Sequence, residues 1–241
     1  MKYVMNKKQS QIMGMIMSGL LFAAMVLVAR ETAQLVTVWK EQESTVTQKC
    51  VVIDAGHGGI DPGKVGINNA LEKDINLSIA MKVKQYLEQQ DIKVVMTRQD
   101  DKGLYQESDS NKKVCDMKAR LKLIEDTNPL LAVSIHQNSY PEESVNGVQV
   151  FYYKDSVQGE KAALLMQEQM IQTLKPKKER VAKENGSYYL LKKTSVPIII
   201  IECGFLSNQN EAQLLTTEEY QNHVAWAIHM GILRYINQSN Q

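Results

Sequence analysis

The sequence predicts a single α/β domain with a mostly parallel, twisted sheet and helices on both faces, preceded by an N-terminal hydrophobic anchor helix. Over residues 49–238, runs rich in Val and Ile alternate with helix-like stretches, as in consecutive βαβ units. Two of these runs, VVIDAGHGG at 51–59 and VSIHQNS at 133–139, lead into a histidine. Strands of such a sheet end at one common edge, so His57 and His136 are expected to meet there.

The N-terminal part differs in kind from the rest. Three lysines precede Ile12–Ala29, which carries no charge and has the length of a short membrane span. Arg30 and Glu31 follow directly, so no small-x-small cleavage site is present. We therefore expect residues 1–30 to form an uncleaved signal anchor rather than a cleaved signal peptide. Residues 31–48 would be a polar linker, and the lysines would place the domain outside the cytoplasm.

Short β-branched runs between turn-rich segments predict the strands, and apolar residues at steps of four, as at Ile75, Ile79 and Val83, predict the helices. The expected order is strand Cys50–Ala55, helix Glu72–Gln90, strand Ile92–Thr97, helix Val114–Asp126, strands Leu130–Ile135 and Val148–Tyr153, helix Gln158–Leu174, a short turn or helix Tyr188–Lys192, strand Pro197–Ile201 and helical residues Asn210–Ile236. Loops are expected at Asp100–Lys113 and Lys175–Lys183.

Composition narrows the function. The chain of 241 residues has a net charge of +1, so it lacks the basic surface of a nucleic-acid-binding protein. The near-zero net charge favours a neutral polymer, or one of mixed charge, as the binding partner. The three cysteines are odd in number and form no CxxC pair, which argues against a zinc knuckle and a disulfide framework. Cys50 and Cys203 are expected to be small buried hydrophobic residues.

The glycine-rich loop after the first strand resembles a phosphate-binding loop in part. Gly58 to Lys64 has the required spacing, but Val65 stands where a P-loop needs Ser or Thr to hold magnesium. Asp61 would also place a carboxylate in a cradle for phosphate. The glycines are better explained as residues that let the backbone turn tightly around His57.

His57, Glu72 and His136 together predict a metal centre. Two imidazoles, one carboxylate and one open position form the ligand set of a catalytic zinc ion. Each residue has an ordinary alternative: a histidine at a strand end can be a hydrogen-bonded polar residue, and Glu72 can stabilise a helix N-terminus. Because all three fall at the same predicted sheet edge, we favour a zinc hydrolase.

Glu202 follows a run of apolar residues expected to form a strand buried on both faces. Burial of an ionised carboxylate there costs roughly several kcal/mol of folding free energy unless the carboxylate is paired or takes part in chemistry. We expect it to act as general base toward water and then as acid toward a leaving amine. The alternative is a structural salt bridge with an arginine such as Arg98 or Arg120.

The remaining candidates carry less information. His223 and His229 lie six residues apart in the last helical segment and therefore on different faces, so surface or core packing explains both. Tyr188 and Tyr189 are equally suited to stacking on a sugar and to covering the core.

These motifs together resemble a known family. VVIDAGHGGIDPGKVG, EKDINLSIA, TRQDD, VSIHQNS and IECGFLSN occur in the order found in the zinc-dependent N-acetylmuramoyl-L-alanine amidases of bacteria, in the third amidase family. The resemblance runs from about Val51 to Ile236. It implies hydrolysis of the amide between N-acetylmuramic acid and L-alanine in peptidoglycan, with zinc held by His57, Glu72 and His136 and catalysis by Glu202. Gln137 stands where the family usually has a small residue, which we interpret as variation near the site.

More narrowly, the single short domain with an anchor is similar to the spore cortex amidases, which prepare muramic acid for δ-lactam formation before germination. This implies an extracytoplasmic location, membrane-anchored or secreted, in the forespore intermembrane space for a spore enzyme. An activating lipoprotein partner and the oligomeric state stay open. Two alternative functions also stay open: another cell-wall zinc peptidase or deacetylase, and a non-catalytic wall-binding protein with structural zinc.

Overall fold

The computed structural model divides the chain into two compact units, Met1–Thr47 and Gln48–Gln241, of which it describes residues 6–45 and 48–238. The first unit is one helix, α1 (Lys7–Thr45). Within the described part of the chain, α1 is the one helix long and apolar enough to cross a membrane, over Ser10–Gln34, and a signal sequence would meet the same criterion.

Helix α1 differs from the sequence prediction in its extent. The helix does not stop at the end of the uncharged run but continues through most of the expected linker to Thr45. Polar residues such as Glu31, Gln34 and Lys40 are good helix formers, so polarity alone did not indicate a break. Residues 46 and 47 of the expected linker and Lys2, the first of the N-terminal lysines, lie outside the described residues. The division into anchor and linker stays a prediction.

The second unit contains a six-stranded sheet in the order β2-β1-β3-β6-β4-β5. Strands β2, β1, β3 and β6 run parallel, whereas β4 pairs antiparallel with β6 and parallel with β5. The predicted fold class, a mostly parallel sheet in an α/β domain, is confirmed. The strands are β1 (Cys50–Ala55), β2 (Lys93–Met96), β3 (Leu131–Asn138), β4 (Gln149–Tyr153), β5 (Lys183–Asn185) and β6 (Ile198–Phe205).

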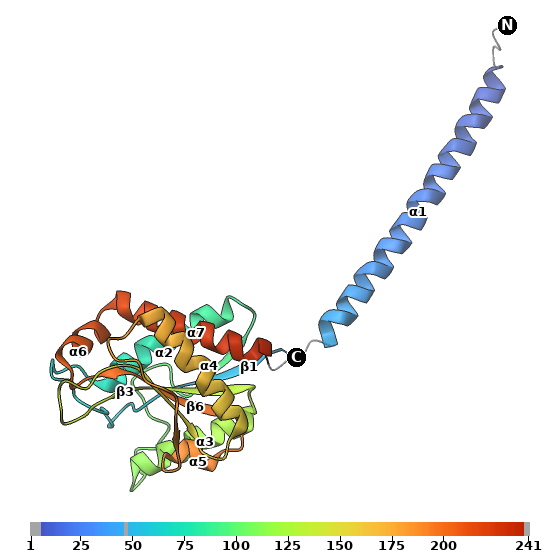
Figure 1. Cartoon of the computed structure of the whole chain (residues 1–241). Helices are drawn as coiled ribbons and strands as arrows, with labels where there is room; N and C mark the ends of the chain where they lie inside the picture. Colours follow the sequence, from blue (N-terminus) through green and yellow to red (C-terminus); the bar gives the residue numbers. More distant parts are fainter. Residues whose placement is uncertain (1–5, 46–47, 239–241) are drawn as a thin grey trace. The chain divides into compact units, whose positions relative to one another are not determined.

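Helices cover both faces of the sheet (Figure 1). Successive strand residues point to opposite faces. Val51 and Ile53 of β1 therefore belong to the larger core, beneath α2 (Glu72–Glu88), α4 (Val157–Leu174) and α7 (Glu218–Gln238). Val52 belongs to a smaller core beneath α3 (Lys112–Thr127) and the short α5 (Tyr189–Lys193). Residues of this smaller core and its edge, Met117, Leu190 and Ile200, also line the pocket described below.

Two details of the elements were not predicted. The helical residues expected over Asn210–Ile236 form two helices, α6 (Gln209–Leu215) and α7, because the Thr217 hydroxyl accepts the Tyr220 N–H and caps a new helix. The expected loop Lys175–Lys183 leads into β5, a strand of three polar residues with no alternating pattern to predict it. The expectation that Cys50 and Cys203 are buried is confirmed for Cys203 and wrong for Cys50, which is only partly buried; all three cysteines are free.

The strands that carry the site residues are longer than predicted. β3 continues past Ile135 to Asn138, and β6 continues past Ile201 to Phe205, because their polar residues keep pairing across the sheet. His136 lies directly beside Glu202 in this register, which shifts between His136 and Asn138. His57 follows the end of β1 by two residues. The sheet thus brings the three segments to one edge.

Candidate metal centre

A pocket of about 650 Å³ opens at the C-terminal edge of β1, β3 and β6. Its lining includes the four predicted site residues, His57, Glu72, His136 and Glu202. Glu72 reaches this edge because it is the first residue of α2, which begins where the glycine-rich loop ends. The prediction that these side chains converge is confirmed by the geometry.

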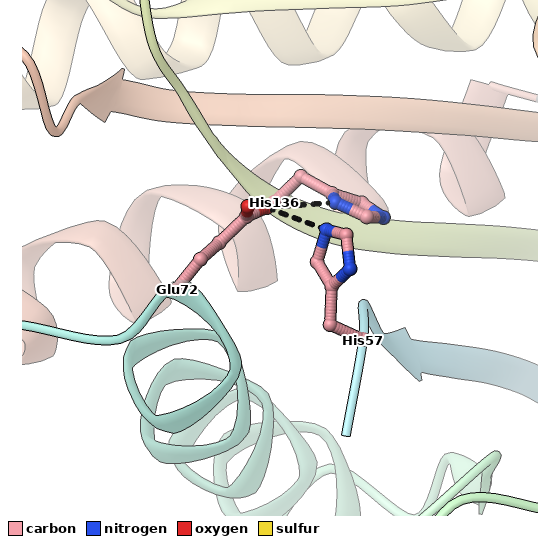
Figure 2. A group of neighbouring side chains, drawn as sticks. All are labelled: His57, Glu72 and His136. Carbon is pink, nitrogen blue, oxygen red and sulfur yellow. Dashed lines mark hydrogen bonds and ion pairs between the residues drawn. The ribbon is translucent and has the colours of Figure 1, made fainter. Parts of the chain in front are cut away.

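His57, Glu72 and His136 form a group that could hold a metal ion, with one ligand atom from each lying within 4.8 Å of the others. Glu72 Oε1 lies 3.2 Å from His57 Nε2 and 2.9 Å from His136 Nδ1. Figure 2 shows both rings directed at the carboxylate. The planes of the two rings are nearly perpendicular, at 79°. Two nitrogens and one oxygen that converge in this way are suitable ligands for a divalent transition metal.

The Glu72 carboxylate is fixed by the backbone around it. Its Oε2 accepts the Lys64 N–H at 2.8 Å, and its Oε1 accepts the Gln137 N–H at 3.1 Å. Burial alone would raise the pKa of Glu72, but hydrogen bonds with His136 and His57 hold that pKa well below its ordinary value. The carboxylate is therefore ionised and acceptor-only, as a metal ligand must be.

His57 is held at both its backbone and its ring. Its φ of 63° lies in the left-handed region, a strained conformation that the surroundings must impose. Arg120 Nη2 donates to the His57 carbonyl, and His57 Nδ1 lies 2.9 Å from Asp61 Oδ2. Burial lowers the pKa of His57, but Glu72 and Asp61 outweigh it and leave the pKa raised.

Two glycines give the rings their space. A Cβ on Gly63, which has a φ of +68°, would lie 2.6 Å from Glu72 Oε2 and 2.7 Å from His57 Cδ2. A Cβ on Gly56 would lie 2.3 Å from the His136 ring. The glycine-rich loop is therefore shaped around the histidines, as the sequence indicated. The phosphate-binding alternative is not favoured, because Asp61 contacts His57.

Glu202 lies beside this group and is 8% exposed. Its Oε2 is buried and has no hydrogen-bond partner within the described part of the chain. Burial raises the pKa of Glu202 to about 7, with His136 acting against the rise and Glu72 adding to it. A carboxyl group with such a pKa can both take up and release a proton near neutral pH.

The two arginines considered as partners for Glu202 are engaged elsewhere. Arg98 donates to the carbonyl oxygens of Ala55 and Gly56, among others. Arg120 pairs with Asp54 at 2.6 Å and with Asp116 at 2.7 Å. The salt-bridge alternative for Glu202 is therefore wrong, because neither guanidinium contacts it.

Sequence reasoning missed this supporting network. Asp54 is 1% exposed in β1 and binds Thr97 and Ser134 as well as Arg120. A carboxylate within a buried strand requires a partner, so the Asp in VVIDA was the available signal. The role of Asp61 was missed too, because its position four residues after His57 was considered only for phosphate binding.

The other candidates lie where packing places them. His223 is exposed, and His229 is buried beside Tyr86 and Trp226. Tyr188 and Tyr189 both line the pocket, and Tyr188 also packs edge-on against the ring of Phe151.

Gln137, the departure from the usual family pattern, is buried. Its Nε2 donates to Asn76 Oδ1 at 3.1 Å, and Asn76 in turn donates to the Gly56 carbonyl. The longer side chain thus lines the pocket and bonds to Asn76, but it is not part of the His57, Glu72 and His136 group.

The fold and the site together define an α/β protein with a histidine–carboxylate group that could hold a metal ion, beside the buried carboxyl of Glu202. Residues 51–234 match the family model described as N-acetylmuramoyl-L-alanine amidase, and the chain belongs to this enzyme family.

Relatives in sequence and structure agree with this assignment. The chain is 39% identical over 203 residues to the germination-specific N-acetylmuramoyl-L-alanine amidase of Bacillus subtilis, covering 83% of this chain and 85% of that protein. It is also similar to the CwlD amidase from Clostridioides difficile, solved in complex with the GerS lipoprotein. That structure has a TM-score of 0.76 and 39% identity, covering 78% of this chain and 98% of the other. An N-acetylmuramoyl-L-alanine amidase from Clostridium difficile 630 has a TM-score of 0.71 and 32% identity, with 78% and 97% covered.

Proposed function

We propose that this enzyme uses zinc, held by His57, Glu72 and His136, to hydrolyse the amide bond between N-acetylmuramic acid and L-alanine in peptidoglycan. The observation that carries the proposal is the convergence of these three side chains beside Glu202, whose buried Oε2 has no partner within the described residues. Nitrogen and carboxylate ligands with an open side toward a pocket are typical of catalytic rather than structural zinc, which is usually enclosed by four ligands.

When bound, zinc supplies a Lewis acid that acidifies water and polarises a carbonyl group. Glu202 performs the proton transfers: it takes a proton from the attacking water and then gives it to the nitrogen of L-alanine as the amide bond breaks. Its burial in the pocket wall keeps the proton from being lost to bulk solvent. His57 and Glu72 keep their orientation throughout, because Arg120 and the loop backbone hold them.

The substrate in the cell is proposed to be spore cortex peptidoglycan. This part of the proposal is supported by the likeness to the germination-specific amidase of Bacillus subtilis and to the CwlD amidase. Removal of the stem peptide would leave muramic acid free for δ-lactam formation by a second enzyme. The near-neutral charge of the chain suits a wall polymer that carries both carboxylates and amines.

We place the enzyme outside the cytoplasm and anchored by α1, whose residues Ser10–Gln34 meet the length and composition of a membrane span. For a spore enzyme the compartment is the forespore intermembrane space. A lipoprotein partner is supported by the complex of the CwlD amidase with the GerS lipoprotein. Such a partner would be anchored to the same membrane and so held at a high local concentration.

The test is digestion of isolated spore peptidoglycan by the zinc-loaded full-length chain in detergent, with products identified by mass spectrometry. Free stem peptides that begin with L-alanine are expected, and a chelator should abolish them. Products cleaved within the stem peptide, or deacetylated sugars, would contradict the amidase assignment. The digestion should also be repeated with the lipoprotein partner added. An enzyme that requires this partner for activation would otherwise give the same result as an inactive protein.

A further inference from the structure

The ring of His57 has two distinct nitrogens, and the structure gives them different neighbours. Nε2 faces the metal group, 3.2 Å from Glu72 Oε1, and Nδ1 lies 2.9 Å from Asp61 Oδ2. Figure 2 shows the first nitrogen joined to Glu72 and the second turned away from it. The ring is thus placed between two carboxylates, one inside the group and one outside it.

We propose that Asp61 is a positioning residue for the metal centre. Its carboxylate accepts a hydrogen bond from the Nδ1–H of His57, which leaves the Nε2 lone pair directed at the metal. The proposal rests on the zinc site proposed above. A neutral imidazole has one N–H and one lone pair, and the partner of the N–H decides which nitrogen is free to bind a metal.

Asp61 is itself held in place, as a positioning residue must be. Its Oδ1 accepts the Gly63 N–H at 3.3 Å and contacts Lys113 Nζ at 2.9 Å. The Asp61 N–H donates to the Gly58 carbonyl at 3.1 Å, which closes the loop around His57. Asp61 thus has one oxygen anchored to the loop and to the start of α3, while the other faces the ring.

A second carboxylate in the same region provides a matched control. Asp101 accepts the Gly59 N–H at 3.1 Å and pairs with Lys73 at 2.7 Å, and neither contact involves His57. Removal of either carboxylate loses one hydrogen bond from a loop glycine N–H and one ion pair with a lysine. Only removal of Asp61 takes the acceptor from the histidine ring.

The experiment measures zinc affinity of the full-length chain in detergent by competition with a chelating dye, for wild type, Asp61→Ala, Asp61→Asn and Asp101→Ala. We expect Asp61→Ala to weaken zinc binding by about 10- to 100-fold. Asp61→Asn should retain part of the affinity, since its amide oxygen still accepts from Nδ1, and Asp101→Ala should match wild type. Equal losses in Asp61→Ala and Asp101→Ala, or wild-type affinity in Asp61→Ala, would overturn the proposal.

A second measurement reads the position of the ring proton in the wild-type protein itself, and a variant serves only to assign the signal. Two-bond ¹H–¹⁵N correlation spectra of the zinc-loaded wild type, with His57 assigned through His57→Gln, report which ring nitrogen carries the proton. Protonated Nδ1 is expected, and protonated Nε2 would refute the positioning role. Absence of zinc binding by the wild type would overturn the metal centre and this inference together. Failure of Asp61→Ala alone to change affinity would leave the amidase proposal intact.

Discussion

The proposed role of Glu202 in proton transfer can be tested with a single substitution. Its carboxyl has a pKa of about 7 because it is buried, and its Oε2 has no partner within the described chain. Glu202→Gln keeps the shape of the protonated form but cannot accept a proton. We expect kcat to fall by about 10²- to 10⁴-fold, while zinc content measured by atomic emission stays that of wild type. Normal turnover in this variant would remove Glu202 from the mechanism.

Ionised Asp54 contributes to the stability of the fold, and this contribution depends on pH. Its burial would raise its pKa, but the Arg120 guanidinium, helped by Ser134 and Thr97, lowers the pKa to about 2 from an ordinary 3.8. A carboxyl with a depressed folded-state pKa stabilises the fold above its ordinary pKa and loses that contribution as pH falls through the folded pKa. We therefore expect about 2 kcal/mol of unfolding free energy to be lost between pH 4 and pH 2.

The measurement for Asp54 compares urea unfolding of wild type and Asp54→Asn across that pH range. At neutral pH the variant should be less stable by roughly 3–5 kcal/mol, because it leaves Arg120 partly unpaired in the core. Other acidic groups titrate in both proteins, so the Asp54 contribution is the difference between them. That difference should shrink toward pH 2; a constant difference would show that Asp54 does not titrate in this window.

Sequence periodicity predicted the strand ends that depend on the local residue pattern and missed those that depend on pairing between strands. The β1 run was bounded correctly, because glycines follow it directly. β3 and β6 were predicted to end at Ile135 and Ile201, where the apolar pattern ends, although backbone pairing continues beyond. His57, Glu72 and His136 could be predicted because parallel strands share an edge. The roles of Asp61 and Arg120 could not be predicted. The contact of Asp61 with His57 depends on the path of a loop, and Arg120 packs against His57 from 63 residues away in the sequence.

The loop between β1 and α2 is an element whose backbone path sets the site. Gly63 lies between the His57 ring and Glu72, with no room for a Cβ and with a φ of +68°. We expect Gly63→Ala to displace one of these side chains and to weaken zinc binding by at least about tenfold, similar to loss of a supporting contact. Gly186→Ala is the control, since its Cβ would meet only Lys154 at 3.6 Å or more. Zinc affinity by dye competition distinguishes the two, and equal affinities would contradict this role of the loop.

The two units of the chain have separate physical roles. The domain has two hydrophobic cores of its own on the two faces of its sheet. The described apolar side chains of α1, from Ile12 to Val28, are instead exposed along the helix. A helix that is apolar on all sides is stable only where lipid or protein covers it. We therefore expect α1 to determine location and the domain to determine chemistry.

This separation gives the last prediction. A chain lacking residues 1–47 should appear in the soluble fraction and release stem peptides from isolated wall at the wild-type rate per molecule, whereas the full chain should remain with the membrane after a high-salt wash. Salt removes proteins held by charge but not those held by a buried span. Intact mass of the membrane-bound form decides between anchor and signal peptide, because cleavage would remove the N-terminal residues. A full-length, uncleaved chain in the soluble fraction would rule out the anchor.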